Sequence, residues 1–225
     1  MTTARLSRAI ATAALAGLVA ASSACSSDGS GTAAAAGSTP ASSGTGSAAA
    51  TSPAADVPAE PFGPGCAGLP AEGPGSLATM AGLSVGTAIS QQPLTTSLTQ
   101  ALLAANLVDV VNTRQDITVL APADAAFQAV DPGRLGALLA DVPRLTTVLT
   151  HHVLAGRLTP DQLVGQHTTL NGDTVTVAGS GTDLTVAADQ TLAGAAPAAV
   201  LCGNVPTANA TVYFVDQLLT PPAAG

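Results

Sequence analysis

Residues 117–127 read ITVLAPADAAF, and this stretch predicts a buried strand that leads directly into a helix. Its first five residues are apolar or β-branched, which is typical of a strand covered on both faces. Pro122 and Asp124 are residue types that start helices. We expect the Asp124 carboxylate to cap the helix that follows it, with Phe127 as the large apolar side chain of that helix.

Apolar residues recur with helical spacing on both sides of this stretch. Before it, Leu94, Leu98 and Leu102 follow Pro93, which suits a first helical turn, and residues 106–112 predict a second short helix. After it, two more helices are predicted by the apolar positions Leu135, Leu138, Leu139, Leu145, Val148 and Leu149.

The second half of the chain changes to the alternating pattern of strands. Residues 168–177, TTLNGDTVTV, alternate around Asn171-Gly172, a pair that favours a type I′ turn and so predicts a hairpin. Residues 184–186 and 211–216 predict further strands. Because helices come first and strands follow, the sequence predicts one α+β domain over residues 76–222.

The start of the chain is typical of an export signal. Two arginines precede an apolar run over residues 9–21, which is too short to span a bilayer. Small residues then lead to Cys25, and this segment resembles the bacterial lipoprotein box, in which the thiol takes a diacylglyceryl group. We expect a signal peptide over residues 1–24, with lipidation at Cys25 as the membrane anchor. The alternative is a secreted protein cut near the same point.

Residues 25–75 predict a linker between this anchor and the domain. Of the 35 residues from 26 to 60, 31 are Ala, Ser, Gly, Thr or Pro, a composition that cannot bury enough surface to fold. Residues 61–75 are rich in turn-forming residues and contain Cys66. We expect a flexible tether that places the domain outside the cytoplasm, held by the lipid or partly released to the medium.

Three cysteines in an exported chain leave one unpaired. If Cys25 carries lipid, Cys66 and Cys202 remain to pair with each other in an oxidising compartment.

The charge balance excludes partners that carry many phosphates or sulfates. The chain has fourteen acidic residues, six arginines and no lysine, and two of the arginines lie in the predicted signal peptide. The mature chain therefore carries about −10, whereas a nucleic-acid binder needs a basic face. Nucleic acids are not expected partners.

No arrangement of residues predicts catalysis, a metal site or a cofactor. Adjacent histidines such as His151 and His152 point in different directions, so they are a poor chelating pair. Asp161 and His167 form a solvated loop pair more readily than part of a triad. Asn209 begins an Asn-Ala-Thr triplet, which fits either a glycosylation site or a turn before the last strand. We expect a protein that is not an enzyme.

Three segments in a fixed order resemble the fasciclin domain family. They are residues 117–127, residues 149–156 (LTHHVLAG) and residues 209–221 (NATVYFVDQLLTP). The chain is most similar to the secreted and lipid-anchored fasciclin antigens of mycobacteria and related actinobacteria, which share the segment around Cys66 and the segment that runs from Cys202 to Tyr213. The resemblance covers about residues 76–222.

The resemblance implies a β-wedge with packed helices and a Cys66–Cys202 bridge. It implies that His152 is a buried, hydrogen-bonded structural residue and that Asp124, Phe127, Asn209 and Tyr213 are further structural positions of the family motifs.

The function implied by the resemblance is adhesion, through contacts of a monomer with proteins or glycans of a cell surface or matrix. Two positions depart from the family pattern: His151-His152 replaces a Tyr-His pair, and Asn204-Val205 lies where some animal members carry an Asp-Ile pair linked to receptor binding. The alternative function is an extracytoplasmic binding protein for an apolar small molecule.

Overall fold

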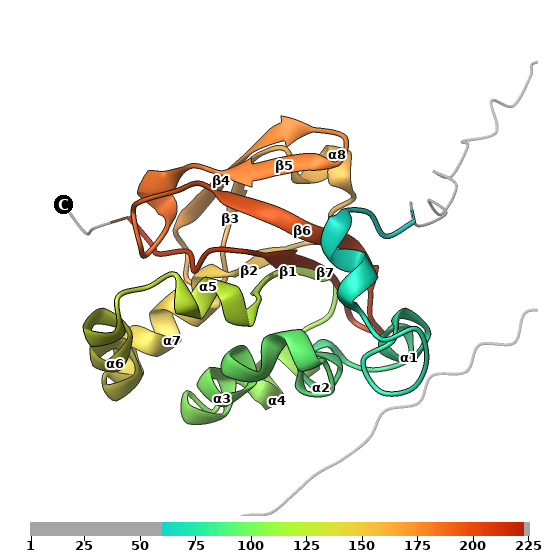
Figure 1. Cartoon of the computed structure of the whole chain (residues 1–225), viewed down its shortest axis with the longest axis horizontal. Helices are drawn as coiled ribbons and strands as arrows, with labels where there is room; N and C mark the ends of the chain where they lie inside the picture. Colours follow the sequence, from blue (N-terminus) through green and yellow to red (C-terminus); the bar gives the residue numbers. More distant parts are fainter. Residues whose placement is uncertain (1–59, 223–225) are drawn as a thin grey trace, which may run out of the picture. The chain divides into compact units, whose positions relative to one another are not determined.

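A mixed sheet of seven strands organises the computed structural model, which describes residues 60–222 (Figure 1). These residues belong to one compact unit, Thr51–Gly225. The predicted signal peptide, Cys25 and residues 26–59 of the predicted linker lie outside the described residues. The strand order is β2-β1-β7-β6-β5-β4-β3. The strands are β1 (Ile117–Pro122), β2 (Val153–Ala155), β3 (Gly165–Thr168), β4 (Thr174–Ser180), β5 (Asp183–Val186), β6 (Ala198–Pro206) and β7 (Ala210–Val215).

Short helices occupy most of the chain before β3, which confirms the predicted α+β class. The α-helices are α1 (Leu77–Ala81), α2 (Val85–Ser90), α3 (Thr96–Ala104), α4 (Val108–Thr113), α5 (Asp124–Gln128), α6 (Pro132–Ala140), α7 (Val142–His151) and α8 (Pro160–Leu163). The 3-10 helices are η1 (Pro64–Gly68), η2 (Pro93–Thr95) and η3 (Ala188–Gln190). Across residues 60–222, none of the helices combines the length and the apolar character that crossing a bilayer requires.

The centre of the sheet is a parallel pair formed by β1 and β7, which lie far apart in the sequence. Ile117 pairs with Ala210 at one end of this register, and Pro122 pairs with Val215 at the other. Both strands are buried along their whole length, which is why each reads as a continuous apolar run. The strand predicted at residues 117–121 is confirmed, whereas its pairing with the last strand was not predicted.

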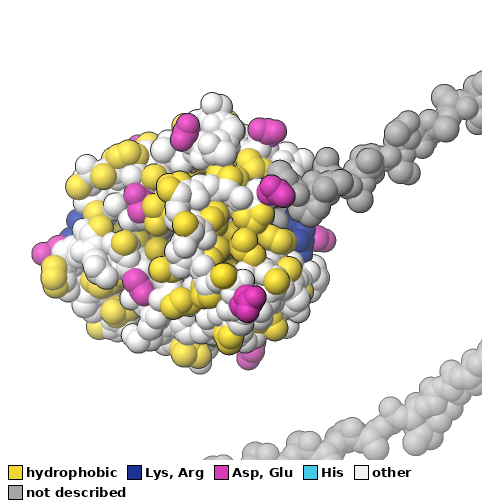
Figure 2. Space-filling view, turned by 45° about the vertical axis from the view of Figure 1, so that its right-hand side comes forward, with side chains coloured by type: hydrophobic (Ala, Val, Ile, Leu, Met, Phe, Trp, Pro, Cys, Tyr) yellow, Lys and Arg dark blue, Asp and Glu magenta, His cyan; other side chains and the backbone are white. Residues whose placement is uncertain are grey.

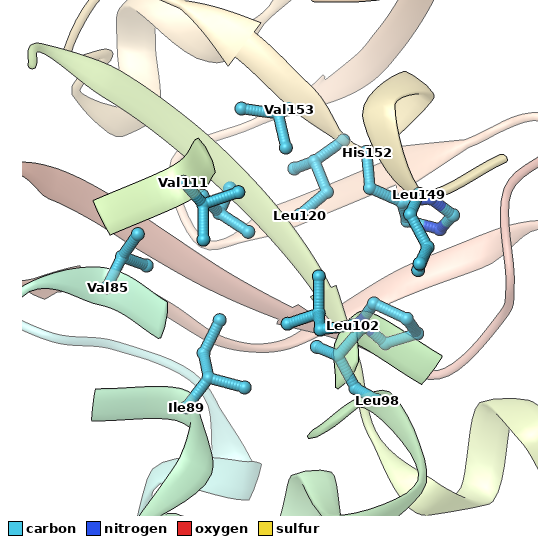
Figure 3. Close-up of a pocket in the computed structure, with 11 residues that line it drawn as sticks. Val85, Ile89, Leu98, Leu102, Val111, Leu120, Leu149, His152 and Val153 are labelled. Atoms are coloured by element: carbon cyan, nitrogen blue, oxygen red, sulfur yellow. The ribbon is translucent and has the colours of Figure 1, made fainter. Parts of the chain in front are cut away.

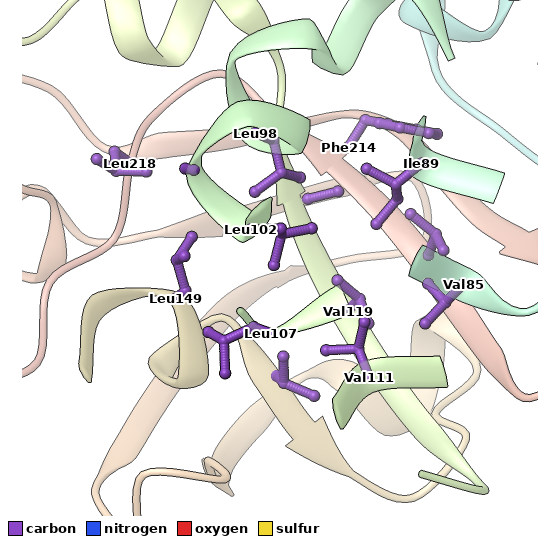
Figure 4. Close-up of a cluster of buried hydrophobic side chains, with 14 of the residues drawn as sticks. Val85, Ile89, Leu98, Leu102, Leu107, Val111, Val119, Leu149, Phe214 and Leu218 are labelled. Atoms are coloured by element: carbon purple, nitrogen blue, oxygen red, sulfur yellow. The ribbon is translucent and has the colours of Figure 1, made fainter. Parts of the chain in front are cut away.

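Alternation along these two strands divides the hydrophobic core into two layers. Val119 and Phe214 face the helices, and the first layer packs them against α2, α3, α4 and α7 (Figure 4). Leu120 and Tyr213 point to the opposite side, where the second layer packs them against β4, β5 and α8. Neighbouring strand residues face opposite sides of a sheet, so one strand pair supplies both layers.

The predicted hairpin forms between β3 and β4, but its turn differs from the prediction. Thr168 pairs with Thr174, so five residues form the loop in place of a two-residue type I′ turn. Gly172 has φ +88°, while Asn171 is not left-handed. The loop is drawn out because Thr169 bridges to Leu154 of β2, which brings the two edges of the sheet together.

Two predicted helices begin later than expected. Residues 106–112 give α4, which starts at Val108, because Asn106 has φ +55° and cannot belong to a right-handed helix. Pro93 opens η2 instead of α3, which begins at Thr96. The helices predicted around Leu138 and Leu149 form as α6 and α7.

A disulfide between Cys66 and Cys202 joins η1 to β6 across 136 residues of sequence. Phe62 also forms a bridge with Gly203, through backbone hydrogen bonds of 3.1 Å and 2.8 Å. A Cβ atom at Gly203 lies 2.5 Å from the Phe62 ring, so only glycine fits beneath that ring. Part of the segment assigned to the linker from its composition is thus bonded to the sheet.

We expect the Cys66→Ser, Cys202→Ser double variant to lose about 2–5 kcal/mol of unfolding free energy, because the bridge limits the unfolded chain over a long loop. Urea unfolding of the oxidised parent and of the variant measures the difference. Two free thiols at Cys66 and Cys202 in the native parent, detected by thiol titration, contradict the bridge.

Candidate functional site

The Asn209 side chain is a buried hub between helices and sheet. Its carboxamide oxygen accepts a hydrogen bond from the Val85 N–H at the start of α2, at 2.8 Å. Its amide nitrogen donates to the carbonyls of Val111 and Arg114, at 2.8 Å and 2.6 Å, at the end of α4. Since this nitrogen is buried and engaged, the turn interpretation of Asn209 agrees with the structure and the glycosylation interpretation does not.

His152 is buried and held at both ring nitrogens. Its Nε2 accepts the Leu219 N–H at 2.9 Å, so Nδ1 carries the ring proton and donates to the Val148 carbonyl at 2.8 Å. The pKa of the imidazole is lowered from 6.5 to about 4, because burial, with a smaller contribution from His151, outweighs the opposing hydrogen bond to Val148. This geometry agrees with the structural role expected for His152.

His151 forms a second polar cluster, with the loop between β3 and β4. Its Nδ1 lies 2.7 Å from Asp173 Oδ1, and Thr169 and Asn171 also donate to that carboxylate. Burial raises the pKa of Asp173, but these three hydrogen bonds outweigh it and hold the pKa below 3.8. The sequence analysis missed this pairing, because nothing in the spacing of His151 and Asp173 indicates that they meet.

Asp124 has a different partner from the one predicted. It is the first residue of α5, whose N-cap is Ala123, so its side chain does not cap its own helix. Asp124 Oδ1 instead accepts the Ser97 N–H at 2.7 Å, in the first turn of α3. The expectation that Asp124 caps the following helix is therefore wrong. Phe127 is buried in the helical core layer, as a motif residue of α5 should be.

Tyr213 lies in the second core layer, on the side of the sheet away from the helical layer. Its hydroxyl donates to the Leu158 carbonyl at 2.9 Å, and its ring meets Phe62 edge-on at a centroid distance of 6.3 Å. Burial, with a contribution from Asp161, raises the pKa of the hydroxyl far above its ordinary value of 10.0. Tyr213 is therefore a fixed structural residue whose hydroxyl keeps its proton.

His167 lies on β3 and is bonded to the backbone of α8. His167 Nε2 bonds to the Leu163 carbonyl at 2.9 Å, and Asp161 is not among its hydrogen-bond partners within residues 60–222. Within residues 60–222, no three side chains of His, Cys, Asp or Glu converge as metal ligands.

A small apolar cavity lies between the helices and β1 (Figure 3). Its volume is about 20 Å³, the space that a single water molecule needs. The only polar side chain lining it, His152, uses both nitrogens elsewhere. Binding sites for small molecules are typically about 300–1,000 Å³, so this cavity gives no support to the alternative of an apolar small-molecule carrier.

A polar groove of about 300 Å³ lies on the other side of the sheet, between the segment after β2 and strand β6. We call it the Arg157 groove; its lining residues are Arg157, Leu158, Thr159, Gln162, Asn204, Pro206 and Thr211. Arg157 Nη2 donates to the carbonyls of Thr207 and Ala208, both at 2.8 Å, which fixes the guanidinium at the rim. The sequence analysis missed this groove, although Thr159-Pro160 followed by Gln162 has the pattern of a capping box, which forms here.

The surface on the η1 side is mostly uncharged. Figure 2 shows hydrophobic side chains across the middle of this face, with scattered acidic side chains and arginine only near its edges. A shallow groove of about 390 Å³ lies between η1 and the start of α5, and its one charged residue is Asp124.

Comparisons with known proteins identify the same family as the three sequence motifs. The family model of the fasciclin domain matches residues 93–221, a span that includes all three motifs. The cell surface glycolipoprotein MPB83 of Mycobacterium bovis is 41% identical over 181 residues, covering 77% of this chain and 78% of that protein. The immunogenic protein MPB70 of the same species is 42% identical over 169 residues, covering 72% of this chain and 82% of that protein. A solved FAS1 domain pair from the insect adhesion molecule Fasciclin I has a TM-score of 0.45 and 21% identity, covering 57% of this chain and 46% of that one.

We expect Asn209→Asp to destabilise the domain by about 3 kcal/mol or more, because a buried carboxylate replaces an amide that donates to backbone carbonyls. Chemical unfolding measures the change. Asn106→Asp is the matched control at an exposed position, and we expect it to stay within about 0.5 kcal/mol of the parent. Equal stability of the two variants contradicts the role assigned to Asn209.

Stability should also fall as the pH drops from 6.5 to about 4. In the unfolded chain the His152 ring takes up a proton near pH 6.5, whereas in the folded chain it does so only near pH 4. Protonation therefore favours the unfolded state between these two values, so the contribution of neutral His152 to the free energy of unfolding is complete above pH 6.5 and is lost on acidification. The loss amounts to about 3 kcal/mol. The contribution of Asp173 is lost only below 3.8. NMR titration of the His152 ring with a midpoint near 6.5 contradicts this assignment.

Proposed function

This chain belongs to the fasciclin domain family, and from that premise we propose that it is a bacterial surface protein that acts by binding proteins or glycans. The observation that carries the proposal is the 41% identity to a cell surface glycolipoprotein, which extends over 77% of this chain. The second relative, an immunogenic protein of the same organism, matches over a similar span.

An extracytoplasmic location is supported by the relatives and by the disulfide. The related M. bovis protein is a cell surface glycolipoprotein by name. A disulfide such as Cys66–Cys202 is typical of proteins that fold in an oxidising compartment. We propose that lipid on Cys25 holds the mature chain to the cell membrane and that residues 26–60 form the tether, with release of some copies to the medium.

Binding without catalysis is the mode of action that the site supports best. The buried polar side chains of the family motifs are used inside the fold: Asn209, His152 and Tyr213 each hold backbone groups in place. The relatives are named for surface location and immunogenicity and not for an enzymatic activity. We propose a monomer that presents one rigid domain to its partner.

The test uses living cells that express either the full chain or its Cys25→Ala variant. We expect the full chain to partition with membranes and to cross-link to defined surface proteins or glycans, identified by mass spectrometry. The variant should appear in the medium, because a single acyl anchor site is removed.

The two measurements test the lipid anchor and the binding function independently. Unchanged membrane partitioning of the Cys25→Ala variant contradicts the lipid anchor but leaves the binding function in place. Recovery of nothing above the level of a chain with an unrelated domain on the same residues 1–59 contradicts the binding function.

A further inference from the structure

We propose that the Arg157 groove is the binding site of this domain and that its ligand is a neutral glycan. The inference rests on the proposed binding function and names the face and the ligand chemistry. It is argued from the groove's volume, its hydrogen-bonding groups and its charge balance.

The groove has hydrogen-bonding groups that are held in place before a ligand arrives. Arg157 Nη2 is fixed by two backbone carbonyls, whereas Nη1 has no hydrogen-bond partner among residues 60–222. Gln162 Oε1 accepts the Thr159 N–H at 3.0 Å, and this bond fixes the orientation of the side-chain amide. Its Nε2 has no hydrogen-bond partner within the described part of the chain and is available to a ligand. Fixed donors lower the ordering cost of binding.

The backbone beneath the groove is equally well held. The Leu158 N–H donates to Thr118 Oγ1 at 2.9 Å, and the Leu158 carbonyl accepts the Tyr213 hydroxyl. On the opposite wall, Asn204 is buried in a left-handed conformation with φ +57°. The two walls therefore come from segments tied to the centre of the sheet, and the groove is formed without a mobile loop.

The charges around the groove select against an anionic ligand. Asp116 Oδ1 lies 3.6 Å from Arg157 Nε, and Asp161 follows Pro160 on α8, close enough to act on the Tyr213 hydroxyl. One arginine among two carboxylates gives no positive field, and the mature chain is strongly acidic overall. An acidic peptide or a sulfated polysaccharide gains little here.

A neutral ligand that is rich in hydroxyl groups matches the hydrogen-bonding and apolar groups of the groove. Sugar hydroxyls both donate and accept, so they can use the Arg157 and Gln162 donors of the groove and the hydroxyl oxygens of Thr159 and Thr211. Leu158 and Pro206 supply apolar surface for the C–H faces of a sugar ring. The volume of about 300 Å³ lies at the lower end of the range for ligand sites, which suits a short segment of a chain.

The experiment titrates the full chain, in detergent, with maltotriose, mannotriose and galactotriose as neutral probes. A heparin tetrasaccharide and hexaglutamate are the anionic probes. Saturation-transfer NMR detects binding, and the side-chain amide signal of Gln162 reports the site. We expect at least one neutral probe to bind and to shift that signal, and neither anionic probe to do so.

Gln162→Glu is the decisive variant, because Glu keeps the acceptor of the capping box and suits a helix N-terminus, but lacks the Nε2 donor. We expect it to weaken the neutral probe about tenfold, the effect of about one hydrogen bond. Gln100→Glu, the same change on the exposed face of α3, should have no effect. Arg157→Met should also weaken binding, and thermal unfolding checks that it folds.

Three outcomes overturn the proposal: no neutral probe binds, an anionic probe shifts the Gln162 signal instead, or binding survives both Gln162→Glu and Arg157→Met. Cross-linking on cells separates this failure from that of the proposed function. If Gln162→Glu recovers the same surface partners as the parent, the groove is excluded and the binding function stands. If the parent recovers none, the function itself fails.

Discussion

The hydrogen bonds of one buried carboxamide hold the two halves of this fold together. Asn209 stands at the entry to β7, and its side chain bonds both the first turn of α2 and the end of α4. Each of these helices is only six residues long, too short to persist without tertiary contacts. The amide fixes their ends against the sheet, and the apolar faces of α2, α4 and β1 then pack with a cavity no larger than about 20 Å³.

A second consequence follows from the scarcity of charge. Only 9% of the residues are charged, so the fold satisfies its polar backbone groups with single side chains placed where chain ends meet. Asp124 of α5 accepts a backbone N–H from the first turn of α3. His152 links the end of α7 to the segment after β7, and Thr118 of β1 accepts the backbone N–H of Leu158 in the Arg157 groove. Each bond joins segments distant in sequence, so removal of one affects several elements together.

Local sequence patterns predicted much of the fold but not its long-range contacts. The strand at residues 117–121, the helices around Leu138 and Leu149, and the hairpin near Gly172 follow from spacing and turn chemistry. The parallel pairing of β1 with β7, the five-residue loop and the Asp173–His151 contact depend on tertiary structure, which no local window contains. Asp124 shows the limit clearly: the residue type predicted a cap, and only the packing of α5 on α3 decides which helix receives it. The Arg157 groove joins residues about 50 positions apart, so its pattern was not visible in the sequence.

The placement of the Cys66–Cys202 bridge determines how the domain carries mechanical load. A pull applied at residue 60 reaches β6 through the disulfide, and this covalent route bypasses the segment between the two cysteines, which are 136 positions apart in the sequence. Asn204 and Pro206 follow Cys202 on the same strand, so a load resisted at the groove passes through only a few residues of β6. The covalent part of the route from residue 60 to the groove is therefore short, because it enters β6 at Cys202, two residues before Asn204.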